Sequence, residues 1–343
     1  MNPNKSYTTT FIFILLLLLV CFITNISLGS VLIPWSDTLS SLLGSSVEKE
    51  SWRNIIINYR LPKAFTAVIA GSGLGISGLL MQTLFRNPLA GPFVLGISSG
   101  ASLGVALLIL GSAYIGGYTV SFLISDWGLL IAASIGSIFV LFLVLLVSAK
   151  VQDTMAILII GLMFGSITTA IVSVLSYFAP AEKLQRYIFW RFGSLGSLSW
   201  ADLLILFGMF FTGMLFAIIA IKPLNTLLLG ENYARSLGLN IKKSRFLIII
   251  STGILAGSIT AFTGPIAFIG LAVPHLTRQL FHTSDHKTLI PAVILLGSII
   301  MLLCDTIAQL PGIEYTLPIN AITSLIGAPV VIWLLVRKRK MLF

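Results

Sequence analysis

The sequence of 343 residues is poor in charge: only 9% of its residues are Asp, Glu, Lys or Arg, whereas 57% are hydrophobic. A soluble domain averages about a quarter charged residues. The mean hydropathy is +1.04, and a chain this long with so few charges cannot bury its apolar surface in one aqueous core. The scarcity of charge therefore excludes a soluble globular protein and predicts a chain that uses lipid as its solvent.

Cysteine is also scarce, since Cys21 and Cys304 are the only two. Both lie within apolar runs, which excludes a disulfide framework or a cysteine-based metal cluster and favours small buried side chains.

The sequence further lacks the Gly-x-x-x-x-Gly-Lys-Ser/Thr motif of a phosphate-binding loop. Any transport would therefore draw its energy from another chain or from an ion gradient.

Long apolar runs are what the sequence has in abundance. A helix needs about 20 mostly apolar residues to cross a membrane, and it satisfies its own backbone groups in lipid. We therefore predict an all-α membrane protein with ten transmembrane helices and a single domain over residues 1–343. The predicted spans are Phe11–Leu32, Ala64–Leu84, Phe93–Leu110, Trp127–Ser148, Thr154–Phe178, Ala201–Ile221, Phe246–Phe262, Pro265–Phe281, Leu289–Ile307 and Leu317–Val336.

Charge placement predicts the orientation of these spans. If the N-terminus is cytoplasmic, the cytoplasmic segments hold 14 of the 21 basic residues and three of the 11 acidic residues, so the net charge of +10 divides into +11 inside and −1 outside. This asymmetry follows the positive-inside rule and places both termini in the cytoplasm. The high pI thus reflects topology and contact with anionic lipid, and it does not indicate a nucleic-acid partner.

The first apolar run also has features of a secretory signal, with Lys5 before it and the small residues 27–30 after it. Cleavage would leave nine spans, with the termini on opposite sides. The run stays apolar through Val31–Ile33, which is long for a signal peptide, and this favours an uncleaved first span.

We further expect amphipathic outer segments at Pro34–Lys63 and Ala179–Trp200, and a long cytoplasmic loop at Lys222–Arg245.

Small residues crowd the second predicted span, which includes Gly71, Gly75 and Gly78. Such residues let neighbouring helix backbones approach closely in lipid. The following stretch, Asn87–Pro92, contains two prolines and predicts a break that re-aims the chain. From the residues alone, this region is a tightly packed helix followed by a re-entrant turn.

Four motifs together resemble the FecCD family of permeases for iron siderophores, haem and cobalamin. They occur in order from residue 60 to the C-terminal end, and they cover about four fifths of the chain. The matching residues are Arg60-Leu61-Pro62-Lys63 with Gln82, Asn87-Pro88-Leu89-Ala90 and Leu95-Gly96; Gly230–Leu239; Gly264–Arg278; and Asp305, Glu314, Leu317-Pro318, Thr323 and Gly327-Ala328-Pro329.

The resemblance implies a cobalamin-permease-like bundle of ten helices, a homodimer with the translocation path on its axis, a separate pair of ABC ATPase subunits and a substrate-binding protein. It implies that this chain binds no cofactor, because ATP and Mg²⁺ would bind the partner ATPase. Its location would be the bacterial inner membrane. The residues that it assigns to ATPase coupling, in the loop of about residues 222–245, are Gly230, Glu231, Ala234, Arg235, Leu237 and Gly238.

On the outer side, the resemblance assigns binding-protein docking to Arg60, Lys63, Gln309 and Glu314, and helix packing or the path to Gly71, Gly75, Gly78, Gln82, Asn87 and Pro88. Two positions depart from the family pattern. Gln309 stands where many relatives have a basic residue, and Asn320 interrupts a common Pro-Val-Gly motif. Other interpretations remain open: a plain surface helix capped by Gly238, and anchoring of Arg60 and Lys63 at the membrane interface.

Other classes of membrane protein would require different residues. A secondary transporter, the main alternative, should carry an ion or proton site near mid-membrane, yet Asp305 and Glu314 both map near the outer end of a span and favour contacts at the outer surface. A haem carrier or membrane enzyme needs ligands within the spans, whereas the three histidines cluster in one cytoplasmic corner. His282 and His286 have a chelating spacing, but without a convincing third ligand they predict no metal site.

Overall fold

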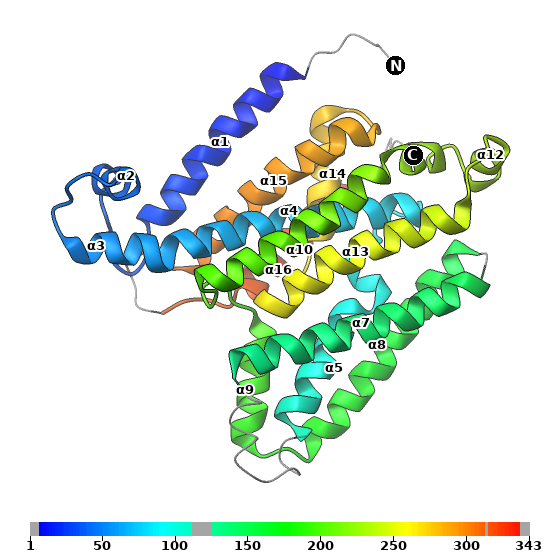
Figure 1. Cartoon of the computed structure of the whole chain (residues 1–343), viewed down its shortest axis with the longest axis horizontal. Helices are drawn as coiled ribbons and strands as arrows, with labels where there is room; N and C mark the ends of the chain where they lie inside the picture. The colour runs from blue at the N-terminus through cyan, green and yellow to red at the C-terminus, as the bar shows by residue number, and fades with distance from the viewer. Residues whose placement is uncertain (1–6, 112–124, 152, 313–314, 337–343) are drawn as a thin grey trace.

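A computed structural model describes residues 7–111, 125–151, 153–312 and 315–336, and these residues form a helical bundle (Figure 1). The described helices are α1 (Thr8–Ser27), α2 (Trp35–Leu43), α3 (Glu50–Ile55), the π-helical turn η1 (Ile56–Arg60), α4 (Leu61–Leu84), the 3-10 turn η2 (Pro92–Leu95), α5 (Ile97–Ile109), α7 (Asp126–Lys150), α8 (Thr154–Tyr177), α9 (Ala181–Phe192), α10 (Trp200–Ile219), α11 (Ile221–Leu227), α12 (Glu231–Ser236), α13 (Ile241–Thr263), α14 (Ile269–Phe281), α15 (His286–Ala308) and α16 (Ile319–Val336).

Each of the ten predicted spans coincides with a helix, which confirms the all-α membrane class. Within the described ranges, seven helices are long and apolar enough to cross a membrane, while α5 and α16 are shorter apolar helices. The eighth predicted span is the least regular, because residues 264–268 are irregular and α14 has only 13 residues. The chain is therefore a multi-pass membrane protein whose spans differ in length.

Helix α4 is the centre of the bundle. In the run that contains it, 89% of the most apolar window is buried, against 17% in α1 and 22% in α8 and α10. Figure 1 shows α4 passing among α15, α10 and α13, while α7, α5 and α8 pack together beside them. The peripheral helices expose their apolar side chains outward, as lipid contact requires.

The glycines of α4 explain why this helix can be central. A Cβ atom on Gly71 would lie 2.1 Å from the carbonyl oxygen of Gly297 in α15, and one on Gly78 would lie 1.6 Å from the carbonyl oxygen of Gly270 in α14. Gly75 faces Val293 and Val273 of the same two helices. Backbone therefore meets backbone at these crossings, as the sequence predicted for a small-residue face.

The outer segments are more helical than expected. Residues 50–84 form one continuous run through α3, η1 and α4, so Arg60 and Lys63 lie within a helix and not in a loop along the membrane surface. In Ala179–Trp200, α9 lies across the bundle at the same end as α2 and α3 (Figure 1). Following the orientation that the charges predict, we call this the outer end, and the opposite end, where α4 ends and α13 begins, the basic end.

The predicted break after α4 is present and ordered. The chain leaves the helix with Arg86 at φ +47° and Gly96 at φ +70°, and the Asn87 side-chain oxygen accepts a hydrogen bond from the Leu89 amide at 2.9 Å. Such Asx turns replace helical hydrogen bonds where proline prevents them. The two prolines therefore redirect the chain from α4 into α5.

A buried carboxylate joins three helices at the outer end. Asp305 of α15, only 2% exposed, accepts hydrogen bonds from Asn25 of α1 at 2.9 Å and from Gln309 at 2.7 Å. Its other oxygen lies 3.1 Å from the ammonium of Lys63 in α4. The expectation that Asp305 contacts partners at the outer surface is therefore wrong, because helices of the same chain enclose its side chain.

Replacing Gly78 with alanine should strongly destabilise the protein, because the added methyl group would displace the backbone of α14. We expect a loss of about 1–3 kcal/mol or more, the usual cost of overpacking. Gly208→Ala in α10 is the matched control, since a Cβ there meets nothing within 4 Å and alanine favours a helix. Thermal unfolding of the detergent-purified variants would measure both, and equal midpoints would contradict the close packing of α4.

Candidate functional site

The predicted coupling motif forms α12, a six-residue helix at the far tip of the basic end (Figure 1). Glycines bound it on both sides: Gly230 has φ +101° and Gly238 has φ +84°. The amides of Gly238 and Leu239 donate to the carbonyls of Arg235 and Ala234, both at 3.0 Å. This is a Schellman termination, in which glycine supplies the left-handed conformation, so the motif's glycines set where the helix begins and ends.

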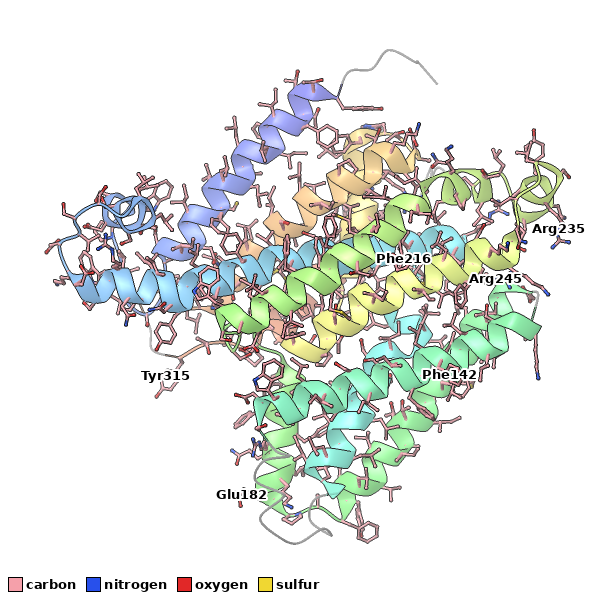
Figure 2. The ribbon with its side chains drawn as sticks, viewed as in Figure 1. Phe142, Glu182, Phe216, Arg235, Arg245 and Tyr315 are labelled. Carbon is pink, nitrogen blue, oxygen red and sulfur yellow. The ribbon has the colours of Figure 1, made fainter. Side chains whose placement is uncertain are left out.

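The residues of the coupling motif divide between two faces. Ala234 is fully buried against the bundle, whereas Tyr233 is 56% and Leu237 is 60% exposed. Arg235 is also exposed, and Figure 2 shows its side chain extending from the tip away from the transmembrane helices. An exposed apolar side chain beside a cation, on a projecting helix, is suited to fill a groove on another protein.

Glu231 behaves differently from its neighbours on α12. Its carboxylate lies 3.2 Å from the guanidinium of Arg245, near the start of α13, and the Glu231 side chain is 28% exposed while that of Arg245 is 5% exposed. The loop predicted at 222–245 thus consists of α11, α12 and the start of α13. Within it, Glu231 points inward and Arg235 points outward.

Polar contacts also hold the basic end of α4. The Gln82 side chain donates to the Leu271 carbonyl at 3.1 Å and accepts a hydrogen bond from Arg278 of α14. Gln82 is fully buried, whereas Asn87 and Pro88 in the break are half-buried. Gln82 therefore fixes α14 against α4 where the chain turns back toward α5.

The histidines do not share one helical face. His282 follows the end of α14 at φ +49°, and His286 begins α15. His286 is fully buried, with one ring nitrogen 2.9 Å from the Thr83 hydroxyl and the other 2.6 Å from the side-chain oxygen of Asn225. The ring thus connects α4, α11 and α15. Among the described residues, no group of three or more His, Cys, Asp or Glu side chains could hold a metal ion.

At the outer end, the residues assigned to docking are engaged within the chain. Arg60 donates to the carbonyls of Ile26 and Ser27, both at 2.8 Å, at the end of α1. Lys63 and Gln309 both bind the Asp305 carboxylate, as described above. Arg60 and Lys63 are half-buried, and Glu314 lies outside the described residues.

Sequence reasoning missed three residues that organise these sites: Asn25, Asn225 and Arg245. Asn25 is the one of the three that the sequence could have pointed to, because it is an amide at the end of an otherwise apolar run. Asn225 and Arg245 lie in a polar loop, where one more polar residue is unremarkable. Their importance is visible only from the partners that the fold gives them.

Known proteins match almost the whole chain, and two of the most similar ones are of the same kind. The chain is 33% identical to a haemin transport system permease of Yersinia pestis over 96% of this chain and 95% of the relative. It is 34% identical to a vitamin B12 import system permease of Klebsiella pneumoniae, over 94% and 92%. Both relatives are permease subunits of transport systems, and both are matched from end to end.

A solved structure described as an inward-facing metal-chelate type ABC transporter superposes with a TM-score of 0.83 at 30% identity, covering 97% of this chain and 100% of that one. A second, PsaBC of Streptococcus pneumoniae, has a TM-score of 0.55 at 16% identity and supports the fold alone. A model of the FecCD transport family matches residues 17–337. The chain therefore belongs to the FecCD transport family and is an ABC transporter permease.

Proposed function

We propose that this permease imports metal chelates, namely iron siderophores, haem or cobalamin, across the bacterial inner membrane. The observation that carries the proposal is the end-to-end similarity to haemin and vitamin B12 permeases. Residues 1–343 act as one permease domain, and two copies enclose the path at their shared axis. Both termini and α12 face the cytoplasm, as the charge asymmetry predicts.

ATP hydrolysis takes place on a separate ABC ATPase, which binds ATP and Mg²⁺, and a periplasmic or lipid-anchored binding protein delivers the chelate. The absence of a phosphate-loop motif from the sequence supports this division. The projecting helix α12, with Arg235 and Leu237 exposed, is the part of the permease that inserts into the ATPase. The outer end, with Arg60 and Lys63, receives the binding protein.

Transport is tested by reconstituting the permease in proteoliposomes with its ATPase and binding protein. We expect ATP-dependent uptake of one member of a panel of haemin, cobalamin and ferric siderophores, with competition by its close analogues. An ATPase variant unable to hydrolyse ATP is the control and should abolish uptake. Uptake driven by an ion gradient without ATP, or no uptake of any chelate, would contradict the proposal.

Leu237→Asp and Arg235→Glu should weaken ATPase binding by about tenfold or more, as expected for central interface residues. Because both side chains are exposed, the thermal midpoint of the permease alone should not change. Lys287→Glu is the control, since it reverses an exposed charge at the same end of the bundle but outside α12. Co-purification of the ATPase measures the effect, and full retention in both variants would rule out α12 as the contact.

Lys63→Gln should slow association of the binding protein at low salt, and the difference should shrink as salt rises, because charges on the outer surface steer encounter. Asp305→Asn is the matched control: it breaks the same ion pair but leaves the cation in place. Surface plasmon resonance at several ionic strengths measures both. If the two variants slow association equally, Lys63 acts by holding α4 to α15 and not by docking.

A further inference from the structure

Helix α12 needs an attachment that its own sequence does not provide. Six residues are too few to form a stable helix alone, and the glycines on both sides have left-handed or otherwise positive φ angles. Two cavities border it, of about 310 Å³ and 810 Å³. Ala234 seats the helix against the bundle, but beside the cavities movement of α12 can reach the transmembrane helices through only a few specific contacts.

Arg245 makes the contacts that join α12 to the bundle. Its side chain is 5% exposed, and one guanidinium nitrogen lies 3.2 Å from the Glu231 carboxylate at the start of α12. The other terminal nitrogen donates to the Val151 carbonyl at 3.0 Å. Val151 directly follows α7, so one planar guanidinium connects α12, α13 and the end of α7 (Figure 2).

The chemistry of this site is specific for arginine. The planar guanidinium presents parallel donors to two acceptors at once, which an ammonium cannot reproduce in the same geometry. The Val151 carbonyl lies at the C-terminal end of a 25-residue helix, where the helix dipole favours a cation. Because the Arg245 side of the ion pair is almost fully buried, salt screens it less than it screens a pair of two surface charges.

We propose that Arg245 is a positioning residue that transmits displacement of α12 to the transmembrane helices α7 and α13. The exposed face of α12 binds the ATPase, and the Glu231–Arg245–Val151 connection carries its movement into the membrane. Glu231 therefore acts within the permease and not as a direct ATPase contact. This inference rests on the proposed ATPase-binding role of α12.

The test compares Arg245→Met with Arg235→Met in the complete complex. Arg245→Met should leave ATPase co-purification and basal hydrolysis intact, but lower uptake and the stimulation of hydrolysis by the loaded binding protein about tenfold, within the usual range of coupling between sites. Arg245→Lys should recover only part of the loss. Arg235→Met should instead reduce co-purification itself.

A purely structural role would give a different pattern. It predicts that Arg245→Met lowers the thermal midpoint, co-purification and uptake together, and that outcome would overturn the proposal. If neither Arg235→Met nor Leu237→Asp affects ATPase binding, the proposed role of α12 fails first, independently of Arg245.

The variant Glu231→Gln tests the same connection if the Arg245→Met protein is not inserted into the membrane. It removes the charge but keeps the side-chain length, and Glu231 is the more exposed partner. Stimulated hydrolysis should fall while co-purification is retained, and the double variant Glu231→Gln/Arg245→Lys should be less impaired than the sum of the single variants, as expected for residues in contact. Strict additivity would contradict a shared connection.

Discussion

The structure depends on how closely three helix backbones approach one another around α4. Lipid offers no hydrophobic drive for helices to associate, so close van der Waals packing has to hold the bundle. Gly71 and Gly78 allow that packing, because the backbones of α15 and α14 occupy the space that side chains would need. Polar contacts between these helices, such as the one between the Ser72 and Ser298 hydroxyls at 2.9 Å, depend on this close packing.

Much of this arrangement could be predicted from the sequence, and the physical reason is the membrane. Apolar runs have to be helices, glycine-rich faces have to be packed, and Asn87–Pro92 has to interrupt a helix. The partners of individual side chains could not be predicted. Asn25 and Asp305 are separated by 280 residues, and no local pattern indicates that α1 and α15 meet. The resemblance therefore assigned Lys63 to docking without any sign that its ammonium binds a buried carboxylate.

The two ends of the bundle use buried charge in a similar way. At the outer end, Asp305 connects α1, α4 and α15; at the basic end, Arg245 connects α12, α13 and the end of α7. Each group is almost fully buried and binds acceptors or donors from different helices. Such pairs fix the relative position of elements more than they stabilise the fold, since desolvation offsets much of their attraction. Both lie where the proposed partner proteins bind.

The uninterrupted helical run of residues 50–84 has a mechanical consequence. Its 35 residues extend about 52 Å at the usual helical rise, whereas the hydrocarbon layer is only about 30 Å thick. A run of this length that stood perpendicular to the layer would extend roughly 20 Å beyond the hydrocarbon, and its outer part includes the π-helical turn η1. A tilt of α4 by about 5° would move the outer end of this run sideways by about 2 Å. A small rearrangement in the core would therefore change the position of residues at the outer surface.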